Sequence, residues 1–198
     1  MADTEWVPPS EIPELVYEAD VVAIDLETYD PDIKTKGPGW ATNNGKVIGV
    51  AIAANGWKGY FPVGHEKGPN LDERVFKRNF KKILDKDNIK VFHNAMYDVG
   101  WLRQWGLEVK GGIVDTMIAA PLIDENRFRY SLNELSKDYL KEKKYESGLY
   151  EAAAEWGTDA KGEMHKLPAM IVGPYAEKDA ELTLKLWNIF KLQIKEDE

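Results

Sequence analysis

The sequence predicts an α/β fold built on a five-stranded mixed sheet, in which an antiparallel meander precedes parallel strands and helices flank the sheet. Short apolar runs rich in β-branched residues stand at five places, and stretches of helical periodicity separate the later ones. Between the second and third runs, Asn55-Gly56 is the dipeptide most typical of a tight hairpin turn. The 198 residues suffice for one domain with its own core.

The first three strands should form the meander. We predict them at residues 21–24, 47–54 and 57–63, where β-branched and aromatic side chains gather. The first strand ends in Asp25-Leu26-Glu27. Residues 29–44 are rich in Pro, Gly, Asn and Lys and are predicted to be a loop, and the sequence assigns no role to its 31–44 part.

Helices should then alternate with two further strands. Asn70, with Glu73 at the capping-box position, is predicted to cap a helix whose apolar residues repeat at helical spacing. Residues 89–92 are predicted as the fourth strand, and Asn94 as the start of the next helix. The fifth strand, at 113–114, ends at Asp115, which we expect to cap the helix that follows.

Beyond Thr116 the sequence predicts only helices and loops. Ser131 and Glu134 form a second capping box, and Gly173-Pro174 is predicted to open the last helix, which runs to about residue 194. Residues 1–18, with three prolines, are expected to be an N-terminal leader that packs loosely on the surface, and residues 19–198 a single domain.

Composition limits the classes of function. The chain has no Cys, no apolar run long enough for a membrane helix and no signal-peptide pattern at its start, so we expect a cytoplasmic protein. A net charge of −8 is unusual for a nucleic-acid binder unless some carboxylates hold cations. Two basic groups could either follow a phosphate backbone or be solvated helix faces: Lys77, Arg78, Lys81, Lys82, Lys86 and Lys90, and Lys137, Lys141, Lys143 and Lys144.

Carboxylates follow two of the predicted strands. Asp25 and Glu27, two residues apart on a strand, point to the same side, and their repulsion would be relieved by a bound Mg²⁺ or Mn²⁺. Asp98, in the first turn of a helix, would join them if the first and fourth strands are parallel neighbours. Each also fits a role without metal, since acidic pairs after strands are common and Asp98 could serve the helix dipole.

A third acidic position lies on the last helix. Tyr175 and Asp179 are four residues apart and share one face, which continues through Leu182 and Leu186. An Asp on an apolar, buried face is unfavourable unless something pairs with it, and a metal shared with the strand carboxylates would do so. A position at the rim of the helix is the alternative.

Three motifs therefore stand in order along the chain: Asp25-x-Glu27, Asn94-x-x-Tyr97-Asp98 and Tyr175-x-x-x-Asp179. Over roughly residues 20–190 they resemble the exonuclease motifs of the DEDD superfamily. The tyrosine marks the DEDDy branch, found in the proofreading domains of family A DNA polymerases, and the match is most similar to bacteriophage versions. The resemblance implies a ribonuclease H-like fold. Such polymerases continue far beyond the exonuclease, so we expect the polymerase domain to be absent from this chain.

The resemblance also implies a mechanism. Asp25 would bridge two divalent cations, Mg²⁺ or Mn²⁺, Glu27 and Asp179 would complete the first site, and Asp98 would hold the second. Tyr175 would orient the attacking water. The product would be a nucleoside 5′-monophosphate cut from the 3′ end of single-stranded or frayed DNA. Contacts to the substrate are expected from Thr28, next to the first motif, and from Asn94 and Tyr97 of the second.

Further expectations follow from the same resemblance: a monomer, a polymerase domain as possible partner in a longer parent protein, and the host cytoplasm as location if a phage encodes it. An RNase D-like exoribonuclease and an inactive nucleic-acid-binding module of the same fold are the alternatives. His93 is expected to pack beside the site and the other two histidines, His65 and His165, to lie on the surface. Trp40 could stack on a base, but plain packing is the favoured interpretation.

Overall fold

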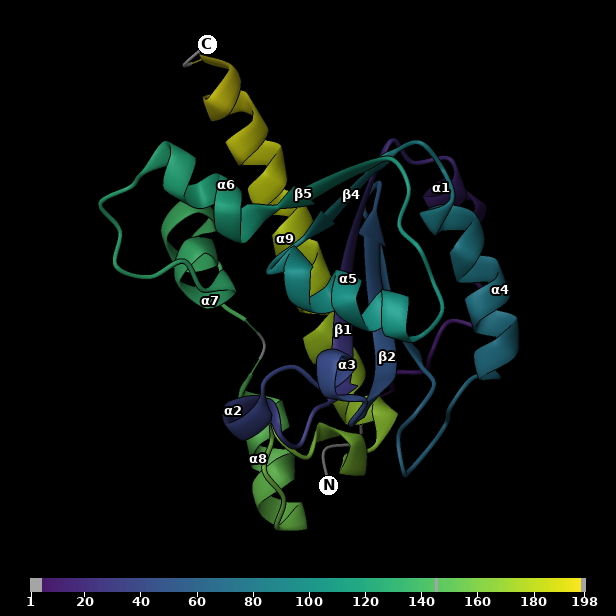
Figure 1. Ribbon diagram of the computed structural model, residues 1–198. Helices are drawn as coiled ribbons and strands as arrows, with labels where there is room; N and C mark the ends of the chain where they lie inside the picture. Colours follow the sequence, from purple (N-terminus) through teal and green to yellow (C-terminus); the bar gives the residue numbers. More distant parts are fainter. Residues whose placement is uncertain (1–4, 145, 197–198) are drawn as a thin grey trace.

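The computed structural model describes residues 5–144 and 146–196 and confirms the predicted five-stranded mixed sheet (Figure 1). Its strand order is β3-β2-β1-β4-β5. β1 pairs antiparallel with β2, and β2 with β3, whereas the pairs β1–β4 and β4–β5 are parallel. The strands are β1 (Val21–Tyr29), β2 (Lys46–Ala54), β3 (Trp57–Pro62), β4 (Ile89–Phe92) and β5 (Gly112–Asp115).

Helices cover both faces of the sheet. Along β1, Val22, Ile24 and Leu26 pack into a core shared with α1, α4 and α5, so the alternate positions Asp25 and Glu27 point to the other face, which α8 and α9 cover. The helical elements are α1 (Glu14–Tyr17), α2 (Ile33–Lys36), α3 (Gly39–Thr42), α4 (Glu73–Leu84), α5 (Ala95–Gln104), α6 (Thr116–Ile123), α7 (Leu132–Leu135), the π-helical turn η1 (Ser136–Leu140), α8 (Ser147–Trp156), the 3₁₀ turn η2 (Met164–Lys166) and α9 (Ala169–Glu196).

Residues 29–44 are not the plain loop that their composition predicted. β1 continues to Tyr29, and the short helices α2 and α3 follow. The Asp30 carboxylate accepts hydrogen bonds from the Gly39 backbone N–H at 3.1 and 3.0 Å, which folds the segment back onto the start of α3. A single acidic side chain thus organises a stretch that is rich in turn-forming residues.

The cap of α4 is Asp72 and not Asn70. The Asp72 carboxylate accepts from the Val75 N–H at 2.9 Å, as an N-cap does. Asn70 instead bonds to the backbone of His65 in both directions, at 3.0 and 2.8 Å, and so closes the loop ahead of the helix. The capping-box prediction was wrong because this local loop contact uses the Asn70 side chain.

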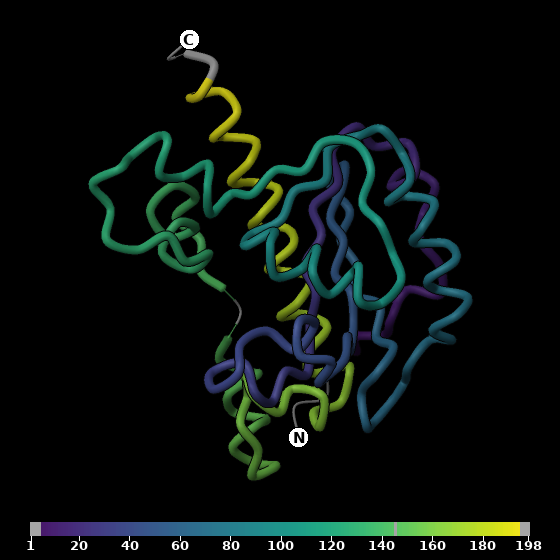
Figure 2. The backbone as a smooth tube through the Cα atoms, viewed as in Figure 1, coloured from purple at the N-terminus to yellow at the C-terminus, as the bar shows by residue number. Residues whose placement is uncertain are grey.

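The last helix begins at Ala169, earlier than the predicted start at Gly173-Pro174, so Pro174 lies inside it. An internal proline removes one backbone N–H from the helix. That loss is outweighed because α9 buries one face, on which Val172, Ala176 and Leu186 are fully buried. Figure 2 shows α9, in yellow, crossing behind the sheet, where it contacts β1, β2, β3 and β4.

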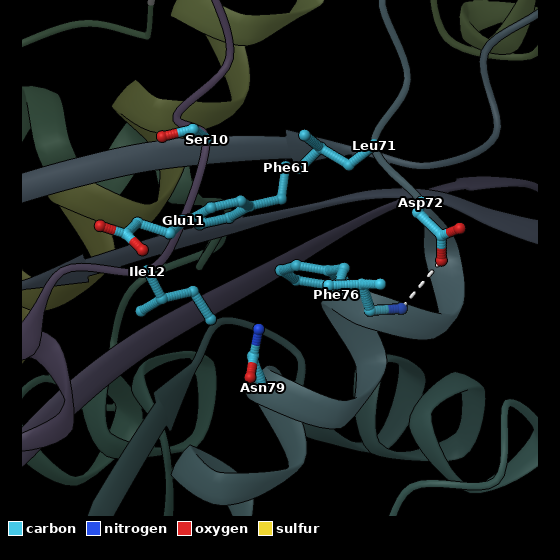
Figure 3. A pocket seen from close by; sticks show the side chains of 9 residues that line it. Ser10, Glu11, Ile12, Phe61, Leu71, Asp72, Phe76 and Asn79 are labelled. Atoms are coloured by element: carbon cyan, nitrogen blue, oxygen red, sulfur yellow. Dashed lines mark hydrogen bonds between the residues drawn. The ribbon is translucent and has the colours of Figure 1, made fainter.

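The N-terminal leader packs more firmly than expected. Ile12 and Val16 belong to the core. Ile12 and Phe76 of α4 line a pocket of about 130 Å³, and Figure 3 shows their side chains near each other. The Trp6 indole N–H donates to the Glu177 carboxylate on α9 at 2.9 Å. Apolar anchors that precede the first strand therefore tie the leader to both layers of helices.

Two predicted caps are confirmed. Ser131 accepts from the Glu134 N–H at 3.3 Å at the start of α7. Asp115 accepts from the Met117 N–H at 2.9 Å at the start of α6. The same Asp115 carboxylate also accepts from the N–H groups of Asn94 and Ala95, at 3.0 and 2.8 Å, so it fixes the start of α5 as well.

Candidate active site

Three carboxylates from β1 and α9 meet on the α9 face of the sheet. One oxygen from each of Asp25, Glu27 and Asp179 lies within 4.8 Å of the others. The alternation of β1 points the first two toward α9, and Asp179 faces them on the buried side of that helix. Sequence positions more than 150 residues apart thus form one acidic cluster, which includes an Asp on the apolar face of α9.

Asp98 lies next to this cluster without belonging to it. β1 pairs with β4 only through residues 21–23, so the second half of β1 extends past β4, and α5 lies beside it. There the buried Asp98 carboxylate accepts a hydrogen bond from the Leu26 backbone. Burial first, and then the charges of Asp25 and Glu27, raise the pKa of Asp98 well above its usual range. Asp98 therefore shares the electrostatic field of the cluster.

The pKa values of the clustered carboxyl groups are raised, because the groups are withdrawn from water and lie close to one another. Burial, followed by the charge of Asp179, raises the pKa of Asp25 to about 7. Burial and the charge of Asp25 raise the pKa of Glu27 well above its ordinary value. Removing these groups from water without a counter-charge is costly, so the protein must supply or bind positive charge here.

Orphaned oxygen atoms indicate where such charge would bind. Glu27 Oε1, Asp98 Oδ2 and Asp179 Oδ1 are buried and have no hydrogen-bond partner. Buried polar atoms are almost always paired, and an unpaired set of carboxylate oxygens fits hard divalent cations such as Mg²⁺ or Mn²⁺. The donor set thus suits the metal chemistry that the sequence motifs predict.

Tyr175 lies one turn before Asp179, with its hydroxyl at the edge of the cluster. The hydroxyl oxygen accepts from the ammonium group of Lys161 at 2.5 Å and from that of Lys144 at 3.2 Å. Burial, and then the charge of Glu27, raise the pKa of Tyr175 above its ordinary value. The side chain is therefore a neutral phenol at physiological pH, which can orient a water molecule but is a poor general base.

Two lysines of the site were missed or misread from sequence. Lys144, assigned to a basic group, reaches the Asp179 carboxylate at 2.6 Å and is mostly buried. Lys161 was not singled out. The two flank α8 in sequence, and only their tertiary contacts reveal them. Lys90, placed in the other basic group, is fully buried and donates to the carbonyl groups of Asn88 and Lys110, so it is not a phosphate contact.

The three predicted substrate contacts lie along the edge between β1 and α5. The Thr28 and Tyr97 hydroxyl groups are 2.8 Å apart, and Tyr97 also donates to Asp30 at 2.9 Å. Asn94 adopts a left-handed conformation, with φ of 75°, at the start of α5. Asp30 was not predicted, because nothing in its local sequence distinguishes it from an ordinary loop Asp.

Two of the histidine predictions were wrong. His65 is buried: its Nε2 accepts from the Tyr60 hydroxyl at 2.7 Å, and its Nδ1 donates to the Leu167 carbonyl at 2.8 Å. Burial lowers the pKa of His65 to about 4. His165 is also buried and packs on the Tyr29 ring with centroids 4.1 Å apart. Both contact residues far along the chain, His65 the Leu167 carbonyl and His165 the Tyr29 ring, and sequence patterns do not reveal such contacts.

The remaining two predictions for ring side chains agree with the structure. His93 packs between the ends of β4 and β5, with its Nδ1 2.8 Å from the Thr116 hydroxyl. Trp40 of α3 packs against the core and lies over Gly100 of α5, which supports the packing interpretation.

A mixed sheet with carboxylates from its central strand and a long crossing helix is the architecture of ribonuclease H-like exonucleases. The fold is similar to NrnC of Brucella melitensis with bound Mg²⁺, with a TM-score of 0.63, 20% identity and coverage of 91% of this chain and 76% of that chain. It is also similar to RNase D of Trypanosoma brucei, with a TM-score of 0.65, 20% identity and coverage of 88% and 58%.

The chain belongs to the 3′–5′ exonuclease family of A-type DNA polymerases, which residues 8–195 match. It is 34% identical over 215 residues to the DNA-directed DNA polymerase of Pseudomonas phage M6, which covers 97% of this chain and 32% of that protein. It is 27% identical over 187 residues to DNA polymerase I of Borreliella burgdorferi, covering 93% and 18%. The chain thus spans about a third or less of the length of these relatives.

Membership of this family makes the chain a hydrolytic nuclease that uses divalent metal ions, and the carboxylate cluster agrees with that requirement. Within residues 5–144 and 146–196, no helix has both the length and the hydropathy of a membrane span.

Proposed function

We propose that this domain is a two-metal-ion 3′–5′ exodeoxyribonuclease that removes nucleoside 5′-monophosphates from the 3′ end of DNA, as the proofreading domain of a phage-type DNA polymerase. The convergence of Asp25, Glu27 and Asp179 beside Tyr175, with Asp98 adjacent, carries this proposal. The similarity to phage and bacterial DNA polymerases supports DNA as the substrate.

The residues divide the chemistry between them. Asp25, Glu27 and Asp179 would hold one divalent cation, Mg²⁺ or Mn²⁺, and Asp98 would hold the second together with Asp25. Bound cations of this kind neutralise phosphate charge and lower the pKa of an attacking water. Tyr175, as a neutral phenol, orients that water toward phosphorus. A bond from water oxygen to phosphorus forms, the bond to the 3′ oxygen breaks, and that oxygen takes up a proton.

Substrate positioning falls to the edge between β1 and α5. Thr28 and Tyr97 hold each other in place, and with Asn94 they would contact the terminal nucleotide. We further propose that residues 19–198 form a single exonuclease domain that acts as a monomer in the host cytoplasm, next to a polymerase domain in a longer parent protein. Residues 1–18 would be its leader, of which Ile12 and Val16 belong to the same core.

An RNase D-like exoribonuclease is the second candidate, because the fold is similar to that of the trypanosomal RNase D. The tyrosine branch and the four carboxylates do not discriminate between the two substrates. An inactive binding module is less favoured, because three of the four motif carboxylates are buried in or beside one cluster: Glu27, Asp98 and Asp179. Such buried charges are costly to keep without a use.

One cleavage experiment tests the proposal. A 5′-labelled single-stranded DNA and an RNA of the same sequence are incubated with Mg²⁺ or Mn²⁺, with EDTA as control. We expect a ladder that shortens from the 3′ end of the DNA and no cleavage in EDTA. A circular DNA strand should resist, and its degradation at the linear rate would show an endonuclease. Preference for the RNA would favour the second candidate.

Variants of the carboxylates complete the experiment. Asp25→Asn should lower single-turnover cleavage by about 10³-fold or more while far-UV circular dichroism stays unchanged, because charge neutralisation at phosphorus supplies several kcal/mol. Asp87→Asn, at an exposed position on the loop before β4, is the matched control and should cleave at the wild-type rate. A folded Asp25→Asn protein with wild-type activity would remove the proposed site.

A further inference from the structure

The ammonium group of Lys144 lies against the site at which a metal ion would bind. Its Nζ is 2.6 Å from Asp179 Oδ2, and the side chains of Lys144 and Asp179 are only 14% and 5% exposed. We propose that Lys144 is a tethered counter-ion that competes with the divalent cation for Asp179, and that a substrate phosphate draws it away. This inference rests on the proposed function and extends it, because it couples metal binding to phosphate binding.

The charge balance supports this role. Lys144 experiences the negative charges of Asp179, Asp25 and Glu27 together. With its Nζ 2.6 Å from the Asp179 carboxylate, the side chain forms an ion pair as an ammonium ion. It therefore provides part of the positive charge that the buried carboxylates need when no cation is bound.

The contact is made to the same carboxylate group that a cation would bind. Lys144 occupies Asp179 Oδ2, whereas Oδ1 of the same carboxylate is buried without a partner. A divalent cation that binds Asp179 beside Asp25 and Glu27 would repel an ammonium group at this distance. Full metal binding therefore requires the ammonium group to leave.

The origin of Lys144 makes such a movement feasible. It lies between η1 and α8, outside any helix or strand, and its ammonium group is at the end of a flexible four-carbon chain. Lys161, which reaches the same Tyr175 hydroxyl, differs because it also pairs with Glu146 at 3.4 Å. In the described part of the chain, the ion pair of Lys144 is with Asp179.

A phosphodiester at the site is the natural alternative partner for the ammonium group. When the phosphate takes Lys144, Asp179 becomes available to the cation, so each ligand should strengthen the binding of the other by the same factor. The domain would then bind its metal ions most tightly when a strand end is present.

Mn²⁺ binding measured by electron paramagnetic resonance of the free ion tests this without any turnover. The titration is run at one fixed pH, with and without thymidine 5′-monophosphate, a product that cannot react further. Without nucleotide, Lys144→Met should bind Mn²⁺ about 5-fold or more tightly than the wild type, which is the lower range of typical coupling between sites. The nucleotide should strengthen Mn²⁺ binding in the wild type by more than in Lys144→Met.

Matched variants define the controls. Lys143→Met removes an exposed neighbouring charge and should match the wild type, and Lys144→Arg keeps the charge and should remain close to it. Lys144→Gln, a second neutral variant, replaces Lys144→Met if that protein loses its circular dichroism spectrum. This inference would be overturned if the neutral variants bound Mn²⁺ no more tightly than the wild type. It would also be overturned if the nucleotide did not change the Mn²⁺ affinity of the wild type. Wild-type Mn²⁺ binding by Asp25→Asn would instead overturn the metal site itself.

Discussion

Tyr97 on α5 donates a hydrogen bond of 2.9 Å to the carboxylate of Asp30, just past the end of β1. The same carboxylate accepts from the Gly39 N–H, so one acidic side chain ties β1, α3 and α5 together. Because Asp98 directly follows Tyr97, this bond also helps to hold Asp98 against Leu26. The segment 31–44, to which the sequence alone assigned no role, is therefore connected to the edge at which substrate would bind.

Asp30→Asn should reduce kcat/KM for a DNA oligonucleotide by about 5- to 10-fold, mostly through KM. The substitution replaces a charged acceptor by a neutral one, and such a hydrogen bond contributes about 1–1.5 kcal/mol. Asp32→Asn is the matched control, since Asp32 bonds to Lys36 and Asn44 at the surface of the same segment. Steady-state kinetics of both variants test this prediction. Equal values of kcat/KM for the two variants would exclude a positioning role for Asp30.

Tyr175→Phe should be slow but active. The hydroxyl accepts from two lysines. In the proposed mechanism it would orient a water molecule, whereas charge neutralisation would depend on the carboxylates and their cations. An orienting group contributes about 10- to 100-fold, at or below the lower range of proton-transfer catalysis. Tyr150→Phe on α8 removes a hydroxyl from another ring that Lys161 approaches, and its single-turnover rate should be unchanged. A loss as large as that of Asp25→Asn would show that Tyr175 does more than orient water.

The separate parts of the site could be predicted from local sequence, but their meeting could not. Strand alternation places Asp25 and Glu27 on one side, and helical spacing places Tyr175 with Asp179. No local sequence pattern indicates that β1 and α9 face each other, and this arrangement was expected only from the family resemblance. Lys161 and Asp30 escaped notice because their roles arise from partners 14 and 67 residues away.

Stability without metal should depend on pH through the raised pKa of Asp25. The pKa of this carboxyl is about 7 in the folded protein, chiefly because of burial, against about 4 when unfolded. The folded state keeps a proton that the unfolded state loses, so the contribution to stability is full below about pH 4 and is lost as pH rises to about 7.

The comparison with Asp25→Asn isolates this effect from that of the surface carboxylates. In EDTA at pH 8, the variant should melt several °C above the wild type, since roughly 2–4 °C corresponds to 1 kcal/mol in a domain of this size. At pH 4.5 the two proteins should melt at nearly the same temperature. Adding Mg²⁺ at pH 8 should reverse the order, because only the wild type has the complete cluster. If the difference in melting temperature between the two proteins were the same at both pH values, the pKa of Asp25 would not be raised in the folded protein.

The chain alone should bind single-stranded DNA weakly and in a salt-dependent manner. Affinity for a phosphate backbone comes mainly from Lys and Arg side chains that displace counter-ions. Here the net charge is −8, and it would stay negative even if two divalent cations offset the four motif carboxylates. Titration of a labelled oligonucleotide in Ca²⁺, which supports binding better than catalysis, should give a Kd of about 10⁻⁴–10⁻⁶ M that weakens as salt rises. Tight binding that ignores salt would require a dedicated DNA surface, and the exposed Lys34 and Lys36 of α2, within the segment that Asp30 organises, would be the first charges to remove.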